Sequence, residues 1–480
     1  MSSEFFPTKP PANGNPKSDS YVRCAPLGPQ KFRTSTLLFL PLHVLGNGQL
    51  QRSSYRIHAA MGANVRKREP MTLFYVIGSL DIGGAEHHLA QITPRLVALG
   101  WEVVVCCLSH RGEQADSLAG EGVNVIAPPF EVIRRWRHPL LRPIRLALAT
   151  FGLILHMLKH RPRIAHFFLP GAYLIGGPVA ILTGVPIRIM SRRSRNHYQL
   201  GRPLAARLEF LLHRRMAAVI GNSRRVVADL AGEGCPREKV GLIYNGVELA
   251  RFHRPSDRAA ARHALGIGEQ EFVAVTVANL IAYKGHLDLI EALAGVRDRL
   301  PGRWVLLCVG RDDGWQSEIE RRAQKRGIAG HVRFLGSRRD VPELLGLADL
   351  GILASHEEGF SNAVIEMMAA GLASVVTDVG GNGEAVRDGV SGFVVPPKSP
   401  GELGRAIARL ACEPSLRNRM GHAARLRVKE HFGLEACVRS YVQLYEALLV
   451  GKPIGQSVQL TPTNKPNPDG GASLPERSVD

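Results

Sequence analysis

Residues 350–377 read LGILASHEEGFSNAVIEMMAAGLASVVT and contain the pattern that decides the fold. Two short apolar runs, Leu350 to Ala354 and Ser374 to Thr377, flank a helical pattern from Ala363 to Ala370. Continuous apolar runs of this length predict strands that are covered on both faces, as in a parallel sheet. The stretch therefore predicts a strand, a helix and a second parallel strand, which is the repeating unit of an α/β protein.

The same alternation continues on both sides of this stretch. A further helical pattern runs from Gln316 to Lys325, and the whole series divides into two halves near Tyr244 to Phe252. We expect two doubly wound, Rossmann-like α/β domains that face each other across a cleft, with ligands beyond the carboxyl ends of the strands. The other predicted strands are Leu73 to Ile77, Glu102 to Cys107, Ile164 to Phe168, Ile187 to Met190, Ala218 to Gly221, Phe272 to Ala278, Trp304 to Gly310 and Val332 to Leu335.

Length and composition agree with two domains. A chain of 480 residues exceeds what one hydrophobic core usually organises, and 45% hydrophobic residues can fill two cores. The predicted boundaries are residues 1–70 for a disordered or loosely packed basic extension, 71–245 and 246–435 for the two domains, 436–450 for a C-terminal helix that could cross back to the first domain, and 451–480 for a disordered tail.

The charge of the chain is strongly positive and local. Lys and Arg number 61 against 42 Asp and Glu, which gives +19 and indicates anionic partners such as phosphorylated substrates, nucleic acid or anionic lipid. From Glu131 to Arg215 sixteen basic residues stand against two acidic ones, and residues 1–70 hold ten against three. Aromatic residues make up only 6%, and no basic motif alternates with stacking side chains, so nucleic acid is disfavoured.

Cysteines and apolar runs limit the location. The seven cysteines are scattered without any Cys-x-x-Cys spacing, so neither a disulfide framework nor a zinc cluster is expected, and a reducing cytosol fits best. The most apolar stretch, Leu146 to Leu158, is shorter than the roughly 20 residues that a spanning helix needs. We therefore expect a protein that does not span a membrane.

A loop with paired glycines follows the first predicted strand. It runs from Gly78 to Glu86 as GSLDIGGAE and leads into a helix near His87. Gly83 and Gly84 would let backbone amides approach a phosphate at the positive end of that helix. The spacing is not Gly-x-Gly-x-x-Gly, so it does not support a dehydrogenase, and a tight structural turn explains the glycines equally well.

A lysine follows the corresponding strand of the second half. The segment from Asn279 to Gly285, NLIAYKG, precedes a helix that starts near His286. A lysine at such a strand exit, here Lys284, can neutralise phosphate charge as a compact cation. Exposed lysines before helices are common, so this segment supports a phosphate site only together with other motifs.

The most specific segment runs from His356 to Glu366. Glu358 would lie in the loop that leaves a strand, and Glu366 about one turn inside the next helix, which Ser361 or Asn362 can cap. Carboxylates accept hydrogen bonds from sugar and ribose hydroxyls, while free N–H groups at a helix start hold phosphate oxygens. This combination fits a nucleotide sugar. Acidic residues near a helix start would explain either glutamate alone, but explain their spacing less well.

Together, these motifs resemble the retaining glycosyltransferases of family 4, which have the GT-B fold. The resemblance extends from about Met71 to Leu449, and the Glu-x7-Glu element is its most specific part. It implies an α/β GT-B architecture in which the first domain binds the acceptor and the second binds the nucleotide sugar. The motifs that carry it are Gly83-Gly84-Ala85-Glu86, Asn245-Gly246-Val247, Lys284-Gly285, and Glu358 with Glu366.

The resemblance also implies a role for each motif residue. Glu358 and Lys284 would act at the reacting centre, where Glu358 binds the donor-sugar hydroxyls and Lys284 offsets the diphosphate charge. Glu366 would bind the ribose hydroxyls, and Gly83 and Gly84 would let the acceptor domain close over the donor. No metal and no cofactor are implied besides the donor substrate. The diphosphate would be held by the backbone amides of Phe360, Ser361 and Asn362.

The chain departs from the family pattern at two positions. The family often has arginine where this chain has the donor-side residue Asn279, so one of the two usual phosphate cations must be replaced or dispensed with. Many relatives show His-x-His where this chain reads His166-Phe167-Phe168. His166 is kept as an acceptor-side candidate, but a hydrogen-bonded core histidine is the favoured interpretation.

We therefore expect a hexosyltransferase of cell-envelope polysaccharide biosynthesis that transfers a sugar, with retention, to a lipid-linked or glycan acceptor. Arginines beside apolar stretches, in segments 134–137 and 192–195, suit an anionic membrane surface. The expected location is cytoplasmic and peripheral, at the inner face of the membrane. Two alternatives stay open: a nucleotide-sugar epimerase of the same fold, which needs no acceptor, and a nucleic-acid-binding protein.

Overall fold

The computed structural model describes residues 72–81, 83–127, 141–195, 199, 201–253, 255 and 257–454. The predicted extension 1–70, the predicted tail beyond residue 454 and the arginine-rich segment 134–137 lie outside the described residues. Among the helices that are described, none is both long and apolar enough to cross a bilayer.

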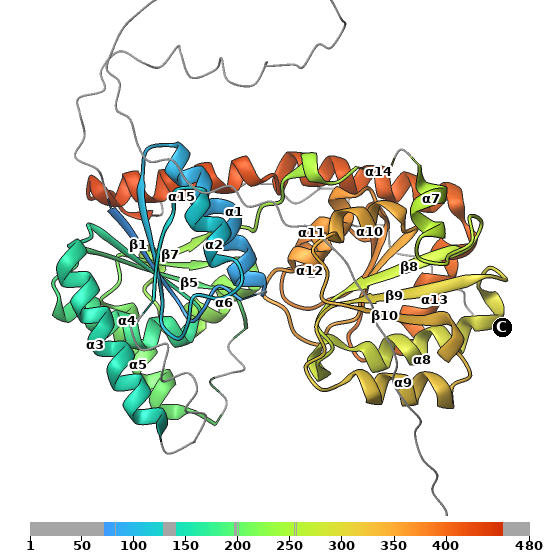
Figure 1. Ribbon diagram of the computed structural model, residues 1–480, viewed down its shortest axis with the longest axis horizontal. Coiled ribbons are helices and arrows are strands. Elements are labelled where there is room, and N and C mark those ends of the chain that lie inside the picture. The colour runs from blue at the N-terminus through green and yellow to red at the C-terminus, as the bar shows by residue number, and fades with distance from the viewer. Residues whose placement is uncertain are drawn as a thin grey trace, which may run out of the picture. The chain divides into compact units, whose positions relative to one another are not determined.

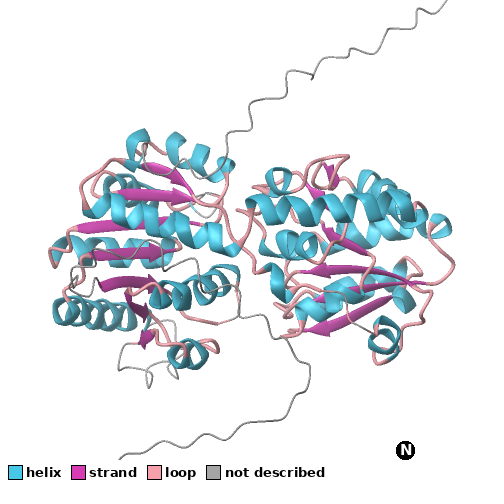
Figure 2. Cartoon of the chain, turned by 90° about the horizontal axis from the view of Figure 1, so that it is seen from above, coloured by secondary structure: helices cyan, strands magenta, loops and turns pink. Residues whose placement is uncertain are grey.

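The first lobe, residues 72–243, contains a seven-stranded parallel sheet in the order β3-β2-β1-β4-β5-β6-β7. Helices pack against the sheet (Figure 2). Along β1, Tyr75 and Phe74 lie on opposite faces, belong to different apolar clusters and are both fully buried. The strands are β1 Thr72–Ile77, β2 Glu102–Cys107, β3 Asn124–Ile126, β4 Ile164–Phe168, β5 Ile187–Arg192, β6 Ala218–Gly221 and β7 Val240–Leu242. The helices are α1 Gly84–Ala98, α2 Ala115–Gly120, α3 Arg142–His160, α4 Pro170–Leu182, α5 Pro203–His213 and α6 Arg224–Gly232.

The second lobe, residues 247–432, contains a six-stranded parallel sheet in the order β10-β9-β8-β11-β12-β13. Val273 and Ala274 of β8 belong to different apolar clusters, so this sheet is also covered on both faces. The strands are β8 Phe272–Val277, β9 Trp304–Val309, β10 Val332–Gly336, β11 Leu350–Leu353, β12 Ser374–Thr377 and β13 Gly392–Val395. The helices are α7 Arg258–His263, α8 His286–Val296, α9 Gln316–Lys325, α10 Val341–Leu347, α11 Asn362–Ala369, α12 Asn382–Ala385, α13 Pro400–Cys412 and α14 Pro414–His431.

Each sheet contains a point where the strand order reverses. The reversal lies between β1 and β4 in the first lobe and between β8 and β11 in the second. The loops that leave β8 and β11 therefore start side by side at one edge of the second sheet, and they carry Lys284 and Glu358. Doubly wound sheets bind ligands at this kind of position.

Helix α15, Leu434–Leu449, brings the chain back to the first lobe, where it packs beside α1 (Figure 1). Tyr441, Leu444 and Tyr445 share an apolar cluster with Tyr75. The hydroxyl oxygen of Tyr445 lies 2.7 Å from that of Tyr75 and 2.9 Å from Nδ1 of His166. A polar chain of contacts thus fixes α15 inside the core of the first lobe.

The two crossings between the lobes are hydrogen-bonded to each other. The amide of Val247 donates to the carbonyl oxygen of Phe432 at 2.9 Å, and the amide of Leu434 donates to the carbonyl oxygen of Val247 at 3.0 Å. A Cβ at Gly246 would lie 2.7 Å from the Cα of Leu434, so this close approach requires glycine. The Asn-Gly-Val motif therefore builds the junction between outgoing and returning chain.

The α/β fold class and the predicted strands are confirmed. Observed strand ends differ from the predicted ends by at most two residues. Three strands were not predicted, β3, β7 and β13, and all three lie at the edges of their sheets. Edge strands are short and only partly buried, so they lack the continuous apolar run of a central strand.

The Tyr445 hydroxyl offers a test of the α15 attachment. Tyr445→Phe leaves buried polar atoms of Tyr75 and His166 without their partner, so we expect the free energy of unfolding of the first lobe to fall by about 1–3 kcal/mol. Urea denaturation followed by circular dichroism measures this loss. Tyr283→Phe, at a ring that is 44% exposed, is the matched control and should have no comparable effect. Equal stability of both variants would contradict the assignment.

Candidate active site

An ion pair joins the loops that leave β8 and β11. Nζ of Lys284 lies 2.6 Å from Oε1 of Glu358, and the Ser355 hydroxyl donates to the same oxygen at 2.7 Å. The Lys284 and Glu358 side chains are only 18% and 10% exposed. Two residues that are far apart in sequence thus meet where the strand order reverses.

Gly285 makes this meeting possible. It has φ of +69°, and a Cβ at this position would collide with the carbonyl oxygen of Ala354 at the end of β11. The single turn Ala282–Lys284 can therefore lie directly against the neighbouring strand exit. In the Lys-Gly pair, Lys284 supplies the positive charge, and Gly285 allows the backbone to approach the end of β11.

Lys284 keeps its positive charge in this environment. Burial alone would lower the pKa of Lys284, but the adjacent Glu358 carboxylate outweighs burial, and the pKa is raised. The two opposite charges offset each other. A ligand can break this ion pair if it accepts hydrogen bonds from Lys284 and donates hydroxyl hydrogen bonds to Glu358.

The N-terminus of α11 lies beside the pair. Ser361 caps the helix, with its hydroxyl accepting from the amide of Val364 at 3.4 Å. The ring of Phe360 is buried against Tyr244 and Phe432, so Phe360 can offer only its backbone to a ligand. The first backbone N–H groups of α11 carry the partial positive charge that attracts phosphate.

Glu366 faces the first lobe from α11. Its Oε1 lies 3.4 Å from Nε2 of His87, and its side chain is 13% exposed. One turn earlier, Nδ2 of Asn362 donates to the carbonyl oxygen of Gly84 at 2.9 Å. The glycine loop of the first lobe therefore contacts the helix that carries the predicted donor-binding residues.

Gly83 is the N-cap residue of α1, in extended conformation. A Cβ at Gly83 would collide with the carboxylate of Glu86, which folds back over the loop. Burial raises the pKa of Glu86 above its ordinary value, with the nearby Arg193 acting in the opposite direction. The start of α1 is thus covered by the carboxylate of Glu86.

Asn279 also follows β8, but its side chain is hydrogen-bonded to the loop after β9. Its Nδ2 donates to Asp313 at 3.3 Å, and its Oδ1 accepts from the amide of Arg311 at 3.2 Å. These contacts tie the loop after β8 to the loop after β9. Asn279 supplies no positive charge, and Arg311 is itself paired with Asp313 at 2.7 Å.

Both lobes match known families. Residues 257–427 match the family described as Glycosyl transferases group 1, and residues 82–251 match the one described as Glycosyltransferase Family 4. The chain is a family 4 glycosyltransferase. The two matches follow the order of the lobes along the chain.

Relatives and solved structures agree with this membership. The D-inositol 3-phosphate glycosyltransferase of Streptomyces griseus subsp. griseus is 28% identical over 418 residues, which cover 78% of this chain and 86% of that protein. The putative glycosyltransferase EpsD of Bacillus subtilis is 30% identical over 206 residues, 42% of this chain and 53% of EpsD. Anabaena Alr3699/HepE, solved in complex with UDP-glucose, has a TM-score of 0.69 at 22% identity and covers 78% of this chain and 100% of its own. The fold of this glycosyltransferase is GT-B.

His166 is not brought to this site. It is 1% exposed, its Nδ1 contacts Tyr445 and its Nε2 lies 2.7 Å from the Ser191 hydroxyl. Burial lowers the pKa of His166 to about 3, and the Arg193 cation contributes. The ring is a neutral core histidine, and its burial gives no support to a role on the acceptor side.

The arginines of segment 192–195 do not form the exposed cationic surface that the sequence suggested. Arg192 is fully buried and pairs with Glu209 and Glu233. Arg195 pairs with Asp229. The expectation was wrong here because Glu209 of α5, Asp229 of α6 and Glu233, the C-cap residue of α6, pair with these guanidinium groups.

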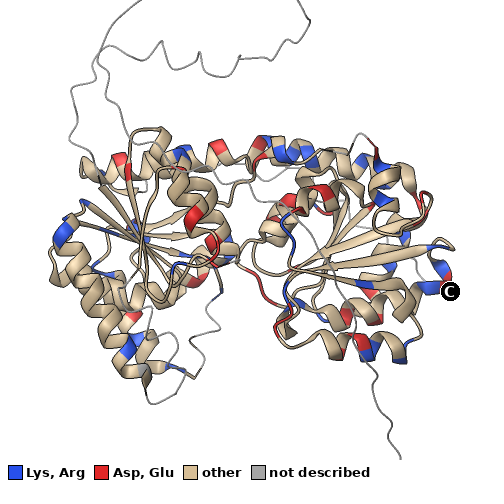
Figure 3. Ribbon diagram, in the orientation of Figure 1, with Lys and Arg blue, Asp and Glu red and all other residues tan. Residues whose placement is uncertain are grey.

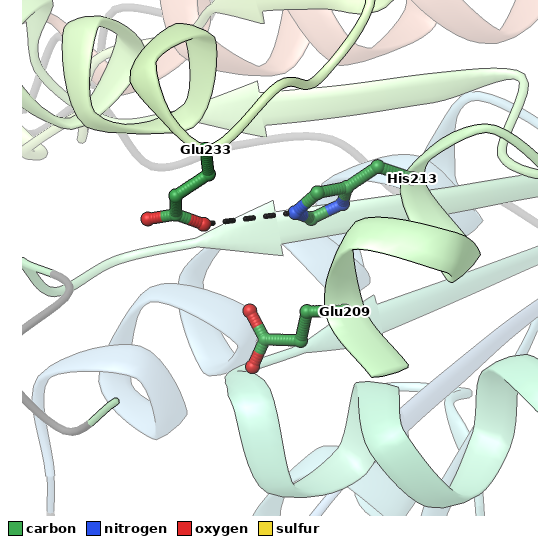
Figure 4. A group of neighbouring side chains, drawn as sticks. All are labelled: Glu209, His213 and Glu233. Carbon is green, nitrogen blue, oxygen red and sulfur yellow. Dashed lines mark ion pairs between the residues drawn. The ribbon is translucent and has the colours of Figure 1, made fainter. Parts of the chain in front are cut away.

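Figure 4 shows Glu209, His213 and Glu233 beside one another, with an ion pair between His213 and Glu233. Arg192 pairs with both carboxylates. Glu209, His213 and Glu233 offer ligand atoms within 4.8 Å of one another, but Arg192 already binds both carboxylates. Burial alone would raise the pKa of Glu233, but hydrogen bonds from His213, Arg192 and neighbouring groups lower it to about 2. This network anchors the end of β5.

Sequence reasoning missed the contacts that join the two lobes at the site. Glu384 of α12 accepts from the amides of Arg224 and Arg225 at 2.9 and 3.3 Å, which places a carboxylate at the N-terminus of α6. Arg225 also pairs with Asp378 at 2.9 Å. No local pattern marks such pairs, because their members are more than 150 residues apart.

The buried His166 predicts a pH dependence of stability. Below the ordinary histidine pKa of about 6.5 the unfolded chain gains a proton that the folded protein binds only near pH 3, so the free energy of unfolding falls as the pH falls. From pH 7 to pH 5 we expect His166 to account for a loss of about 2 kcal/mol. In His166→Gln the free energy of unfolding, measured by urea denaturation, should fall by about 2 kcal/mol less between pH 7 and pH 5 than in the wild type. The exposed His253→Gln is the control, and an unchanged slope in His166→Gln would rule out the assignment.

Proposed function

We propose that this glycosyltransferase moves a sugar from a nucleotide-diphosphate sugar to a lipid-linked or cell-envelope glycan acceptor, with retention of the anomeric configuration. The observation that carries the donor assignment is the Lys284–Glu358 pair beside the capped N-terminus of α11. Together they offer a cation, backbone donors and a carboxylate at one place. The complex of Anabaena Alr3699/HepE with UDP-glucose supports a donor of this class.

The donor diphosphate would bind to Lys284 and to the first amides of α11. Breaking the bond to the anomeric carbon leaves a nucleoside diphosphate with developing negative charge, and a fixed cation and helix amides stabilise that charge. Glu358, released from Lys284, would accept hydrogen bonds from sugar hydroxyls. Glu366 would accept them from the ribose, in place of its present contact with His87.

Retention is proposed from the family resemblance. The acceptor hydroxyl and the departing phosphate would then lie on the same face of the sugar ring, with the loop at Gly83 and Gly84 bringing the first lobe close to the donor. The contact between Asn362 and Gly84 supports such an approach. The configuration of the product, determined by NMR, decides between retention and inversion.

The first lobe carries an exposed apolar surface that supports membrane binding. Of the fourteen large hydrophobic side chains that are exposed in the described residues, nine lie on α3, α4 and α5. Helix α4 contacts both α3 and α5, so the three helices form one layer. The nine residues are Ile144, Leu146, Phe151, Leu155, Leu158, Leu182, Leu204, Leu208 and Leu211.

The helices that carry this apolar surface contain basic residues and little exposed negative charge. The sequence of α3 contains Arg142, Arg145 and Lys159 and no acidic residue, and α3 is largely uncharged along its length (Figure 3). The acidic residue of α5, Glu209, is fully buried with Arg192. Apolar side chains flanked by cations fit an anionic lipid surface, where each basic residue adds about 1 kcal/mol. We therefore propose that the enzyme binds peripherally to the cytoplasmic face of a membrane.

The donor site is tested by Lys284→Ala and Glu366→Ala. We expect each variant to lose about 100-fold or more in kcat/KM, because stabilisation of the leaving group or grip on the nucleotide is removed. A panel of UDP-, GDP- and ADP-sugars, screened by heat protection and product formation, identifies the donor first. Lys325→Ala, at an exposed lysine of α9, is the control. Near wild-type turnover in either site variant contradicts the assignment, and conversion of the donor without any acceptor favours an epimerase.

The membrane surface is tested by the double variant Phe151→Asp, Leu155→Asp. These side chains are 54% and 51% exposed, so the fold should tolerate the change while vesicle binding falls several-fold. Sedimentation with phosphatidylglycerol vesicles at low salt measures binding, and phosphatidylcholine vesicles show the dependence on lipid charge. Leu426→Asp, at a 45% exposed leucine of α14, is the matched control. Binding that is indifferent to lipid charge and to the double variant would refute the proposal.

A further inference from the structure

Arg193 directs a guanidinium group away from the Arg192 network. Side chains alternate along an extended chain, so the anchoring of Arg192 on Glu209 and Glu233 sends the next side chain to the other face. The Arg193 guanidinium carbon lies 5.9 Å from the ring centroid of Phe168. One of its nitrogens donates to Oδ1 of Asn245.

Arg193 forms no ion pair with a carboxylate within the described part of the chain. Arg192 and Arg195 each form ion pairs, but the hydrogen-bond partners of Arg193 are the neutral Asn245 and the Tyr441 hydroxyl. The Arg193 side chain is partly buried, and burial lowers its pKa, while Tyr441, Cys437 and the Glu86 carboxylate act in the opposite direction. A partly buried cation without an ion-pair partner carries charge that a bound anion can neutralise. Such a group indicates that an anion binds nearby.

Arg193 lies next to the proposed donor site. Nδ2 of Asn245 donates to Oδ1 of Asn362 at 2.6 Å and to the carbonyl oxygen of Phe360 at 2.9 Å. A Cβ at Gly359 would collide with the carbonyl oxygen of Arg193, so the loop before α11 lies directly on this residue. One asparagine thus separates the guanidinium from the helix start that would hold phosphate.

The donor site itself is short of positive charge. Lys284 is the cation at the β8 exit, and Glu358 already neutralises it. Asn279 is neutral and engaged by the loop after β9. A nucleoside diphosphate leaving group therefore requires a second cation from another element.

We propose that the Arg193 guanidinium binds a phosphate group of a substrate at the junction of the two lobes. The planar, permanently charged fork of arginine can bind phosphate through two hydrogen bonds while Asn245 holds its orientation. This inference rests on the proposed function, and the phosphate has two possible sources. One is the donor diphosphate; the other is a phosphate on the acceptor, as in the name of the Streptomyces griseus inositol 3-phosphate enzyme.

The test compares Arg193→Gln and Arg193→Lys with the wild type, and Arg195→Gln serves as the control. Protection against heat first identifies which of UDP, GDP and ADP binds the wild type. Calorimetry then measures the affinity of each protein for that nucleotide and for its parent nucleoside. If Arg193 binds the donor, Arg193→Gln lowers the affinity for the nucleoside diphosphate about tenfold or more and leaves the affinity for the nucleoside unchanged. Arg193→Lys should retain part of the affinity, and Arg195→Gln all of it.

Inorganic phosphate distinguishes the acceptor source. It is titrated into each protein with and without saturating nucleoside diphosphate. If Arg193 holds an acceptor phosphate, the nucleotide-loaded wild type and Arg195→Gln bind inorganic phosphate, and Arg193→Gln does not. The proposal is overturned if Arg193→Gln binds both the nucleoside diphosphate and inorganic phosphate like the wild type, or if neither probe binds the wild type. If none of the three nucleotides binds the wild type, the donor assignment is wrong. The titration with inorganic phosphate still shows whether Arg193 binds phosphate.

Discussion

The Lys284–Glu358 ion pair is the interaction on which the site depends. It exists because two parallel strands that are adjacent in space but distant in sequence end at the same edge, and because Gly285 allows their exits to touch. The two side chains are only 18% and 10% exposed, and each provides the other with a polar partner. The site is thus assembled in advance, and a substrate has to replace an interaction that already exists.

The positive charge of the chain is distributed very differently from what a count of residues suggests. Part of the excess in the first lobe is internal, where Arg192 and Arg195 are bound by carboxylates and stabilise the packing of α5 and α6 against β5. Arg193 is set apart from both by the alternation of the backbone. Three arginines within four residues therefore have different surroundings, and net charge alone describes none of them.

Much of the fold could be predicted from the sequence, because central strands such as β1 and β9 are continuous apolar runs and the Glu358 to Glu366 segment has a specific spacing. The edge strands β3, β7 and β13 could not, since they are only three or four residues long and partly exposed. The pairing of Lys284 with Glu358 follows from topology and was within reach of sequence reasoning. The surroundings of Arg192, and the hydrogen bonds of Asn245 across the junction, depend on tertiary packing between distant segments and leave no local pattern.

The hydrogen bonds between Val247, Phe432 and Leu434 limit how the enzyme can move. Since the outgoing and returning segments are hydrogen-bonded to each other beside the second lobe, the two crossings have to move together. Any change in the angle between the lobes therefore has to turn the outgoing and the returning chain at the same place, next to Gly246.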